Sequence, residues 1–90
     1  MDDTARQQAL NRLKSAAGHL QGTIKMLEDD RYCIDVIKQV QAVQAALEKT
    51  NQMILDSHLR TCVTTAIQHD DATERERVLN EVMDVFRASQ

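Results

Sequence analysis

The residues that mark turns and strands are nearly missing from this sequence. It has no proline, only two glycines (Gly18 and Gly22) and only two aromatic residues (Tyr32 and Phe86). Proline and glycine punctuate regular elements, and aromatic residues are enriched in strands. Their scarcity argues against a strand-rich fold and predicts an all-α protein.

Other absences narrow the class of protein. No stretch approaches the roughly 18 to 20 consecutive apolar residues that a membrane span needs. The first residues, Met1, Asp2 and Asp3, are polar and acidic where a secretory signal peptide is basic and then apolar. We therefore expect a cytoplasmic protein without a membrane partner. The sequence shows no nucleophile beside a base, no glycine-rich phosphate loop and no carboxylate pair spaced for acid–base chemistry, so we expect no enzyme.

The amount and the distribution of charge point in different directions. Ninety residues with 42% apolar content fit a single domain, residues 1–90. The net charge of −3 opposes nucleic-acid binding, because phosphate-binding surfaces are usually basic. However, residues 4–27 contain no acidic residue and four basic ones, which makes this segment locally cationic: Arg6, Arg12, Lys14 and Lys25.

Apolar residues at alternating steps of three and four predict three helices. The first spans roughly residues 4–28, a tight turn follows around residues 29–32, and the second runs from residue 33 to about residue 66. The third follows a polar break at residues 68–73, with Thr73 as its N-cap and Glu76 as the capping-box partner. The three stripes contain Leu10, Leu13, Ala17, Leu20, Ile24 and Leu27; Ile34, Ile37, Val40, Val43, Leu47, Ile54 and Cys62; and Val78, Leu79, Val82, Val85 and Phe86.

The second predicted helix is too long for a domain of this size. A helix of about 35 residues is about 52 Å long at 1.5 Å per residue. Its apolar stripe therefore has to be buried against another copy of the chain. The sequence predicts an obligate oligomer built on paired long helices.

One histidine and the two cysteines form a candidate metal site. His58 and Cys62 are four residues apart, so on a helix they share a face. Cys33 lies 25 residues before His58, about 37 Å along a helix, and joins them only across an antiparallel dimer. Such a dimer crosses near residues 46 and 47, where Ala45 and Ala46 would let the backbones approach closely. On spacing alone, an exposed His58 and a Cys62 that merely fills the core stay equally open.

The donor types favour copper(I). A pair of cysteines in a reducing compartment more often binds metal or is redox-active than forms a structural disulfide. Thiolates select copper(I) or zinc, and three ligands without a ready fourth suit copper(I) better than tetrahedral zinc. Nickel or cobalt would call for more nitrogen and oxygen donors, and neither His19 nor His69 has an obvious place in the set.

Much of the chain strongly resembles the copper-sensitive operon repressors. The resemblance is carried by LNRLKSAAGHLQG, MLEDDRYCIDVIKQVQAVQAALEK and SHLRTC, and by the spacing of Cys33, His58 and Cys62. It implies a three-helix protomer, an antiparallel long-helix dimer with a four-helix-bundle core, and a dimer of dimers. It also implies that Cys33 of one protomer binds Cu(I) together with His58 and Cys62 of the other. Tyr32 and Glu81 are implied as outer contacts of these ligands, although the connection before the third helix is longer here.

The same resemblance implies a repressor that binds double-stranded operator DNA in the apo form and leaves it when Cu(I) binds. Arg12 matches the main DNA-contacting position, and Lys14, Lys25 and Lys49 are weaker candidates. Gln52 stands where a basic residue is often found. Fewer cations predict a shallower salt dependence, because each neutralised phosphate adds about 0.9 to the slope of log affinity against log salt.

Two alternatives remain open at this stage. The chain could belong to a relative of this family that senses persulfide, formaldehyde or nickel, and a persulfide sensor would need the two thiols without the imidazole. It could also be a purely structural helical oligomer with incidental cysteines, which would lose copper(I) to a modest competitor.

Overall fold

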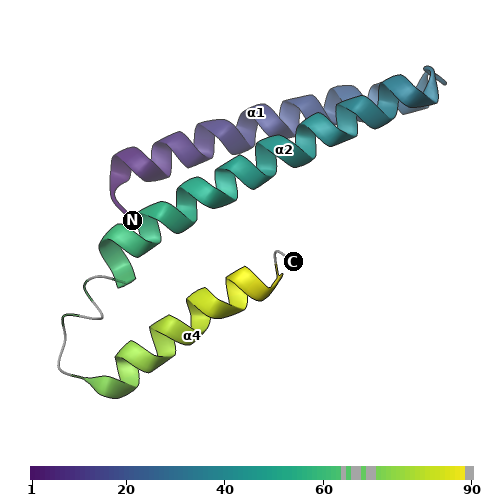
Figure 1. Ribbon diagram of the computed structural model, residues 1–90. Helices are drawn as coiled ribbons and strands as arrows, with labels where there is room; N and C mark the ends of the chain where they lie inside the picture. The colour runs from purple at the N-terminus through teal and green to yellow at the C-terminus, as the bar shows by residue number, and fades with distance from the viewer. Residues whose placement is uncertain (64, 66–67, 69–70, 89–90) are drawn as a thin grey trace.

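The computed structural model describes residues 1–63, 65, 68 and 71–88, with the backbone alone at residues 62 and 63. Its helices are α1 (Asp3–Glu28), α2 (Cys33–His58), the π-helical turn η1 (Leu59–Val63) and α4 (Ala72–Ala88). Figure 1 shows how α1, α2 and α4 are arranged. No strand occurs in these residues, so the predicted all-α class is confirmed. None of the helices described has the length and apolar character that crossing a bilayer requires.

Helix α1 begins and ends with specific caps. The Asp2 side chain accepts a hydrogen bond from the backbone N–H of Ala5 at 2.7 Å. At the other end Asp30 adopts a positive φ of 54°, and the N–H groups of Asp30 and Arg31 bond to the carbonyls of Leu27 and Met26. This is the Schellman arrangement, which closes a helix sharply. The predicted turn at residues 29–32 is thereby confirmed, and α2 folds back beside α1.

Small residues hold the two helices of this hairpin together. Every seventh residue is buried along both helices: Ala9, Ala16 and Thr23 on α1, and Val36, Val43, Thr50 and Ser57 on α2. The Thr23 and Thr50 hydroxyls donate to the carbonyls of His19 and Ala46, which satisfies these buried polar groups. A seven-residue repeat is the pattern of a coiled coil, and small side chains let the two backbones approach.

The larger apolar residues are not in this seam. Beside it, both helices expose a second row of apolar residues along the whole hairpin, which we name the apolar face: Leu10, Leu13, Leu20, Ile24 and Leu27 on α1, and Ile37, Val40 and Leu47 on α2. Leu47, for example, keeps 43% of its surface exposed. Exposed apolar surface of this extent marks an interaction site. Of the stripes predicted for the first two helices, Val43 is buried in the hairpin's own seam, whereas most of the larger residues stay exposed, which agrees with their expected burial against another copy.

The dimensions of the protomer explain why its described residues bury few apolar side chains. It measures 58 × 28 × 14 Å, and its radius of gyration is 17.6 Å. A compact chain of this length has a radius of gyration of about 12 Å. The smallest dimension is close to the diameter of one helix, about 10 to 12 Å. The protomer is therefore a plate one helix thick, and a plate buries its faces only by association.

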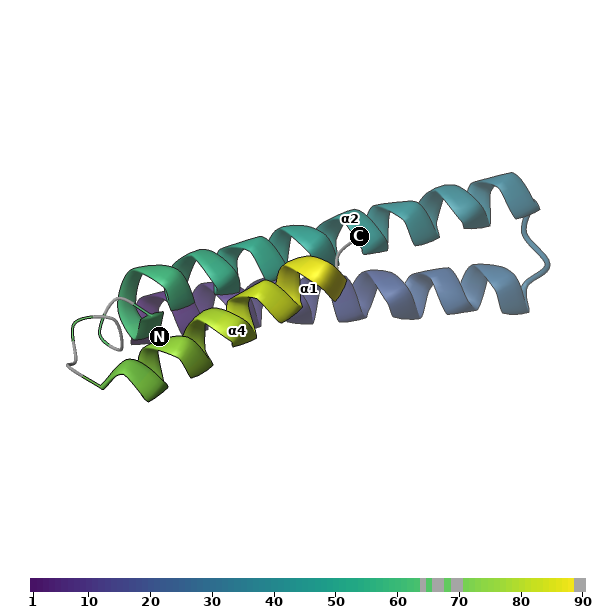
Figure 2. The same ribbon diagram turned by 60° about the horizontal axis from the view of Figure 1, so that its bottom comes forward.

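Helix α4 runs back along the hairpin from the end where η1 lies (Figures 1 and 2). Among the described elements it contacts η1, and Val78 and Val82 form its buried cluster. Asp71 caps it: Oδ1 accepts from the N–H groups of Thr73 at 3.0 Å and Glu74 at 3.3 Å. The predicted N-cap Thr73 is therefore wrong, because the helix begins two residues earlier than that prediction requires.

Replacing the cap should destabilise α4. We expect Asp71→Ala to lower stability by about 0.5 to 2 kcal/mol, because two backbone N–H groups lose their acceptor. Thermal unfolding followed by circular dichroism measures this change. Thr73→Ala is the matched control and should change stability far less. Equal effects of the two variants would contradict Asp71 as the cap.

Candidate metal centre and DNA-contacting face

Cys33 and His58 are the first and last residues of α2. The Cys33 thiol is free and exposed, whereas His58 is half-buried. At 1.5 Å per residue the two lie about 37 Å apart along the helix. Among the side chains that the structure describes, no three of His, Cys, Asp and Glu lie close enough to hold a metal ion. A site containing both Cys33 and His58 therefore needs a second protomer.

The helical register places Cys33 on the apolar face. It belongs to a row that recurs every seven residues along α2: Cys33, Val40, Leu47 and Ile54. Each member of this row lies three positions before a buried residue of α2 that faces α1. In an uninterrupted α-helix, the next position of this row would be residue 61. The π-helical turn at Leu59–Val63 takes up one extra residue, because its hydrogen bonds reach five residues along the chain. Cys62 lies within this turn, and the structure describes only its backbone.

This row has Leu47 at its middle and the candidate ligands at its ends. A two-fold axis near Leu47 would bring Cys33 of one protomer to the end of α2 in the other. Ala46, one of the two alanines at which a close approach of the copies is expected, lines a groove between α1 and α2 within the protomer. Ala46 belongs to the packing of the hairpin, and the position at the centre of the apolar face is a leucine.

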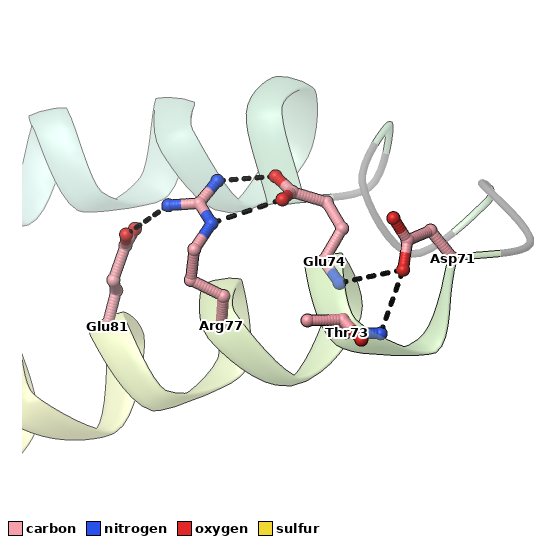
Figure 3. Close-up of polar contacts among 5 residues, drawn as sticks. All are labelled: Asp71, Thr73, Glu74, Arg77 and Glu81. Carbon is pink, nitrogen blue, oxygen red and sulfur yellow. Dashed lines mark hydrogen bonds and ion pairs between the residues drawn. The ribbon is translucent and has the colours of Figure 1, made fainter.

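Tyr32 and Glu81, the implied outer contacts, are both exposed in the protomer. Tyr32 precedes α2 as its N-cap residue without a side-chain capping hydrogen bond, and its exposed fraction is 66%. Glu81 pairs with Arg77, which also pairs with Glu74 (Figure 3). The two carboxylates raise the pKa of Arg77, with Glu74 as the main cause. Exposed ion pairs are weak, so Glu81 can leave Arg77 for another partner at low cost.

The four candidate DNA contacts differ in their surroundings. Arg12 borders the groove that Ala46 also lines. Lys25 pairs with Asp29 at 3.2 Å, whereas no described carboxylate forms an ion pair with Arg12, Lys14 or Lys49. Lys25 is therefore the weakest of the four candidates, because its charge is already compensated.

Sequence reasoning missed two features of this region. The π-helical turn has no recognisable sequence signal. His19, which had no assigned role, forms a 2.6 Å hydrogen bond with Gln39 and so links α1 to α2. Its position three residues after the buried Ala16 was a signal that it borders the seam. His69 lies outside the described residues.

Comparisons with known proteins agree with this architecture. A crystal structure of the copper-sensing repressor CsoR with Cu(I) from Geobacillus thermodenitrificans NG80-2 superposes with a TM-score of 0.86 at 36% identity, covering 98% of this chain and 88% of that one. The nickel-responsive transcriptional regulator InrS superposes with a TM-score of 0.75 at 35% identity, covering 89% and 90% of the two chains.

Named relatives give the same result. The copper-sensing transcriptional repressor CsoR of Bacillus subtilis (strain 168) is 39% identical over 82 residues, which cover 91% of this chain and 78% of the relative. The protein of the same name from Mycobacterium tuberculosis (strain ATCC 25618 / H37Rv) is 56% identical over 59 residues, or 66% of this chain. The chain spans about half the length of the mycobacterial relatives it matches, 50% in this case.

A family model decides the assignment. Residues 5–88 match the model of the metal-sensitive transcriptional repressors. This match confirms the resemblance derived from the sequence, and the family it describes consists of regulators rather than enzymes. The chain belongs to the family of metal-sensitive transcriptional repressors.

Proposed function

We propose that this chain is a Cu(I)-responsive repressor, which binds double-stranded operator DNA without metal and releases it when Cu(I) binds. The observation that carries the proposal is the placement of Cys33 and His58 at opposite ends of one helix, whose apolar face is left exposed by the described residues of the protomer. The site is completed by pairing two copies, so metal binding acts on the quaternary structure. Residues 1–90 then form a single sensing and DNA-binding domain.

The donor chemistry supports copper(I) as the metal. Cys33 of one protomer would bind it together with His58 and Cys62 of the other. Two thiolates and one imidazole are a soft set of three, which suits a low-coordinate copper(I) ion. When bound, the ion supplies a bond between the α2 helices of two protomers. Similarity to copper-sensing repressors over most of the chain also favours copper, and similarity to a nickel-responsive regulator keeps nickel as the alternative.

The arrangement of the helices offers a route from metal to DNA. His58 ends α2, η1 follows directly, and η1 contacts α4. Tyr32 and Glu81 would form the outer contacts of the ligands; a carboxylate that accepts the free N–H of a ligating histidine fixes its tautomer. Arg12, Lys14 and Lys49, with Lys25 as the weakest candidate, would contact DNA in a cytoplasmic dimer of dimers. By linkage, DNA must weaken Cu(I) binding by the factor by which Cu(I) weakens DNA binding.

A mobility-shift assay with the duplex from upstream of the chain's own gene tests the proposal. The apo protein should retard this duplex, and Cu(I) held at a defined free concentration should abolish the retarded band. Typical coupling energies of about 1 to 3 kcal/mol correspond to an affinity loss of about 5- to 150-fold. Parallel reactions contain Ni(II), a persulfide donor or formaldehyde. Release by one of these but not by Cu(I) would replace copper as the signal, and no retardation by the apo protein would refute the repressor.

A further inference from the structure

We propose that Arg77 sets the Cu(I) concentration at which the protein responds, because it holds Glu81 and must release it before Glu81 can bond to His58. The inference rests on the proposed function, in which Glu81 is an outer contact of the histidine ligand. It assigns a positioning role to a residue outside the ligand set. The arrangement that carries it is the row of Glu74, Arg77 and Glu81, which project from one side of α4 (Figure 3).

The Glu81 carboxylate is occupied by Arg77. Nη1 of Arg77 donates a hydrogen bond to Glu81 Oε1 at 2.5 Å. Among the described residues, Arg77 is the only partner of the Glu81 side chain. The two residues are four apart on α4, and side chains at this spacing are neighbours on any helix. The pair therefore forms whenever α4 is folded, and Glu81 can serve another partner only by leaving it.

Glu81 also borders the buried side of α4. It follows the buried Val78 by three residues and precedes the buried Val82 by one. Among the described residues, no Cα atom of α4 lies within 8 Å of a Cα atom of α2, the helix that ends with His58. Glu81 therefore has to turn its carboxylate away from α4 and toward the hairpin in order to reach the ring. A carboxylate held against Arg77 on its own helix cannot make this reach.

Glu74 makes the release of Glu81 reversible. It accepts from Nε of Arg77 at 3.1 Å and also from Nη2, a bidentate contact that fixes the guanidinium group. The two carboxylates raise the pKa of Arg77, mainly through Glu74. When Glu81 leaves, the guanidinium group still has a carboxylate partner and stays in place to capture Glu81 again. Arg77 is therefore a hold on Glu81 that opens and closes without unfolding α4.

The exposure of this pair sets the size of its effect. The side chains of Arg77 and Glu81 keep 56% and 52% of their surface exposed. Exposed ion pairs shift an equilibrium by at most about fivefold. The apparent affinity for a ligand falls in proportion to the fraction of protein that is competent to bind it, here the fraction in which Glu81 is released. Arg77 should therefore raise the Cu(I) concentration needed for a response by about two- to fivefold.

A double-mutant cycle in the full-length protein tests the inference. Arg77→Met removes the cation and keeps a long apolar stem, so it should tighten Cu(I) binding by about two- to fivefold in competition with a chelator. Glu81→Ala should weaken binding by about 10- to 100-fold. In the Glu81→Ala background Arg77→Met should have no effect, because no carboxylate is left to release.

Arg87→Met is the matched control. It removes the same charge from the same helix and breaks another exposed ion pair, between Arg87 and Asp84. Cu(I) affinity should stay within about 1.5-fold of the wild type, because salt screens exposed charges that lie far apart. If Arg77→Met binds Cu(I) like Arg87→Met, Arg77 does not hold Glu81. If Arg77→Met still tightens binding in the Glu81→Ala background, its effect is one of general charge, and the inference is also wrong.

NMR of the Arg77 guanidinium group gives a readout that does not depend on affinity. Adding Cu(I) to the wild-type protein should move its resonances toward their positions in metal-free Glu81→Ala, because both changes remove Glu81 from Arg77. Unchanged resonances would show that Glu81 stays on Arg77 in the loaded protein and would overturn the inference. If Glu81→Ala binds Cu(I) like the wild type, the inference fails while the three-ligand site stands. Failure of the wild-type chain to bind Cu(I) would instead refute the proposed function itself.

Discussion

Two variants that each lose Cu(I) should regain it when they are combined in one oligomer. Cys33→Ala removes one thiolate and His58→Ala removes the imidazole. Loss of an outer contact of a metal ligand already costs about 10- to 100-fold in affinity, so loss of a ligand should cost at least about 100-fold. If the site spans two protomers, a mixed dimer keeps one complete site, formed by Cys33 of one variant and by the His58 and Cys62 of the other.

The measurement is Cu(I) bound against a competing chelator by separately purified and by co-expressed variants. Random pairing makes half of the dimers mixed, each with one of two sites intact, so about a quarter of the wild-type copper should be retained. A Cys33→Ala variant co-expressed with itself under a second tag is the matched control and should retain none. Absence of copper in the mixed oligomer, with helicity intact, would place all the ligands within one protomer and refute the shared site.

The outline of the fold could be predicted because helix periodicity and helix ends have local causes. The bounds of α1 and the turn at residues 29–32 agree with the prediction to within a residue or two. The predicted N-cap of α4 was wrong because Asp71 and Thr73 are both good capping residues. Only the observed hydrogen bonds show that Asp71 is the cap. The π-helical turn inside the predicted long helix has no local signature of this kind.

The faces of the hairpin were harder to predict than its helices. A hydrophobic pattern draws attention to Leu13 and Leu47, whereas the hairpin is packed through Ala9, Ala16 and other small residues. Small side chains contribute little apolar area but permit close backbone contact, which a pattern based on hydrophobicity does not weigh. The distance between Cys33 and His58 followed from the helical rise alone. The groove around Arg12 could not be predicted, because its lining residues are polar and in the sequence resemble any solvated helix surface.

A lysine at the centre of the apolar face should dissociate the oligomer. Leu47 keeps 43% of its surface exposed in the protomer and lies near the middle of α2. Near a two-fold axis, Leu47→Lys removes two leucines from one interface and sets two ammonium groups close together. Burying a leucine contributes about 1.5 to 3 kcal/mol, so the dimer should weaken by at least about 100-fold. Because the protomer is a plate 14 Å thick, dissociation should also reduce its stability.

Gln52→Lys is the control on the same helix. It adds the same side chain at an exposed position outside the apolar row of Cys33, Val40, Leu47 and Ile54, so it should leave the oligomer intact. It also adds a cation at a position where the resembling repressors often have a basic residue. It should therefore steepen the slope of log affinity for DNA against log salt by about 0.9 for each new phosphate contact. Sedimentation velocity and thermal unfolding measure both variants. If Leu47→Lys sediments like the wild type, the copies do not pair through this face, and the candidate ligands at its two ends have no common partner surface. If Leu47→Lys dissociates and Gln52→Lys does not, the same row of apolar residues supports both the metal centre and the stability of the fold.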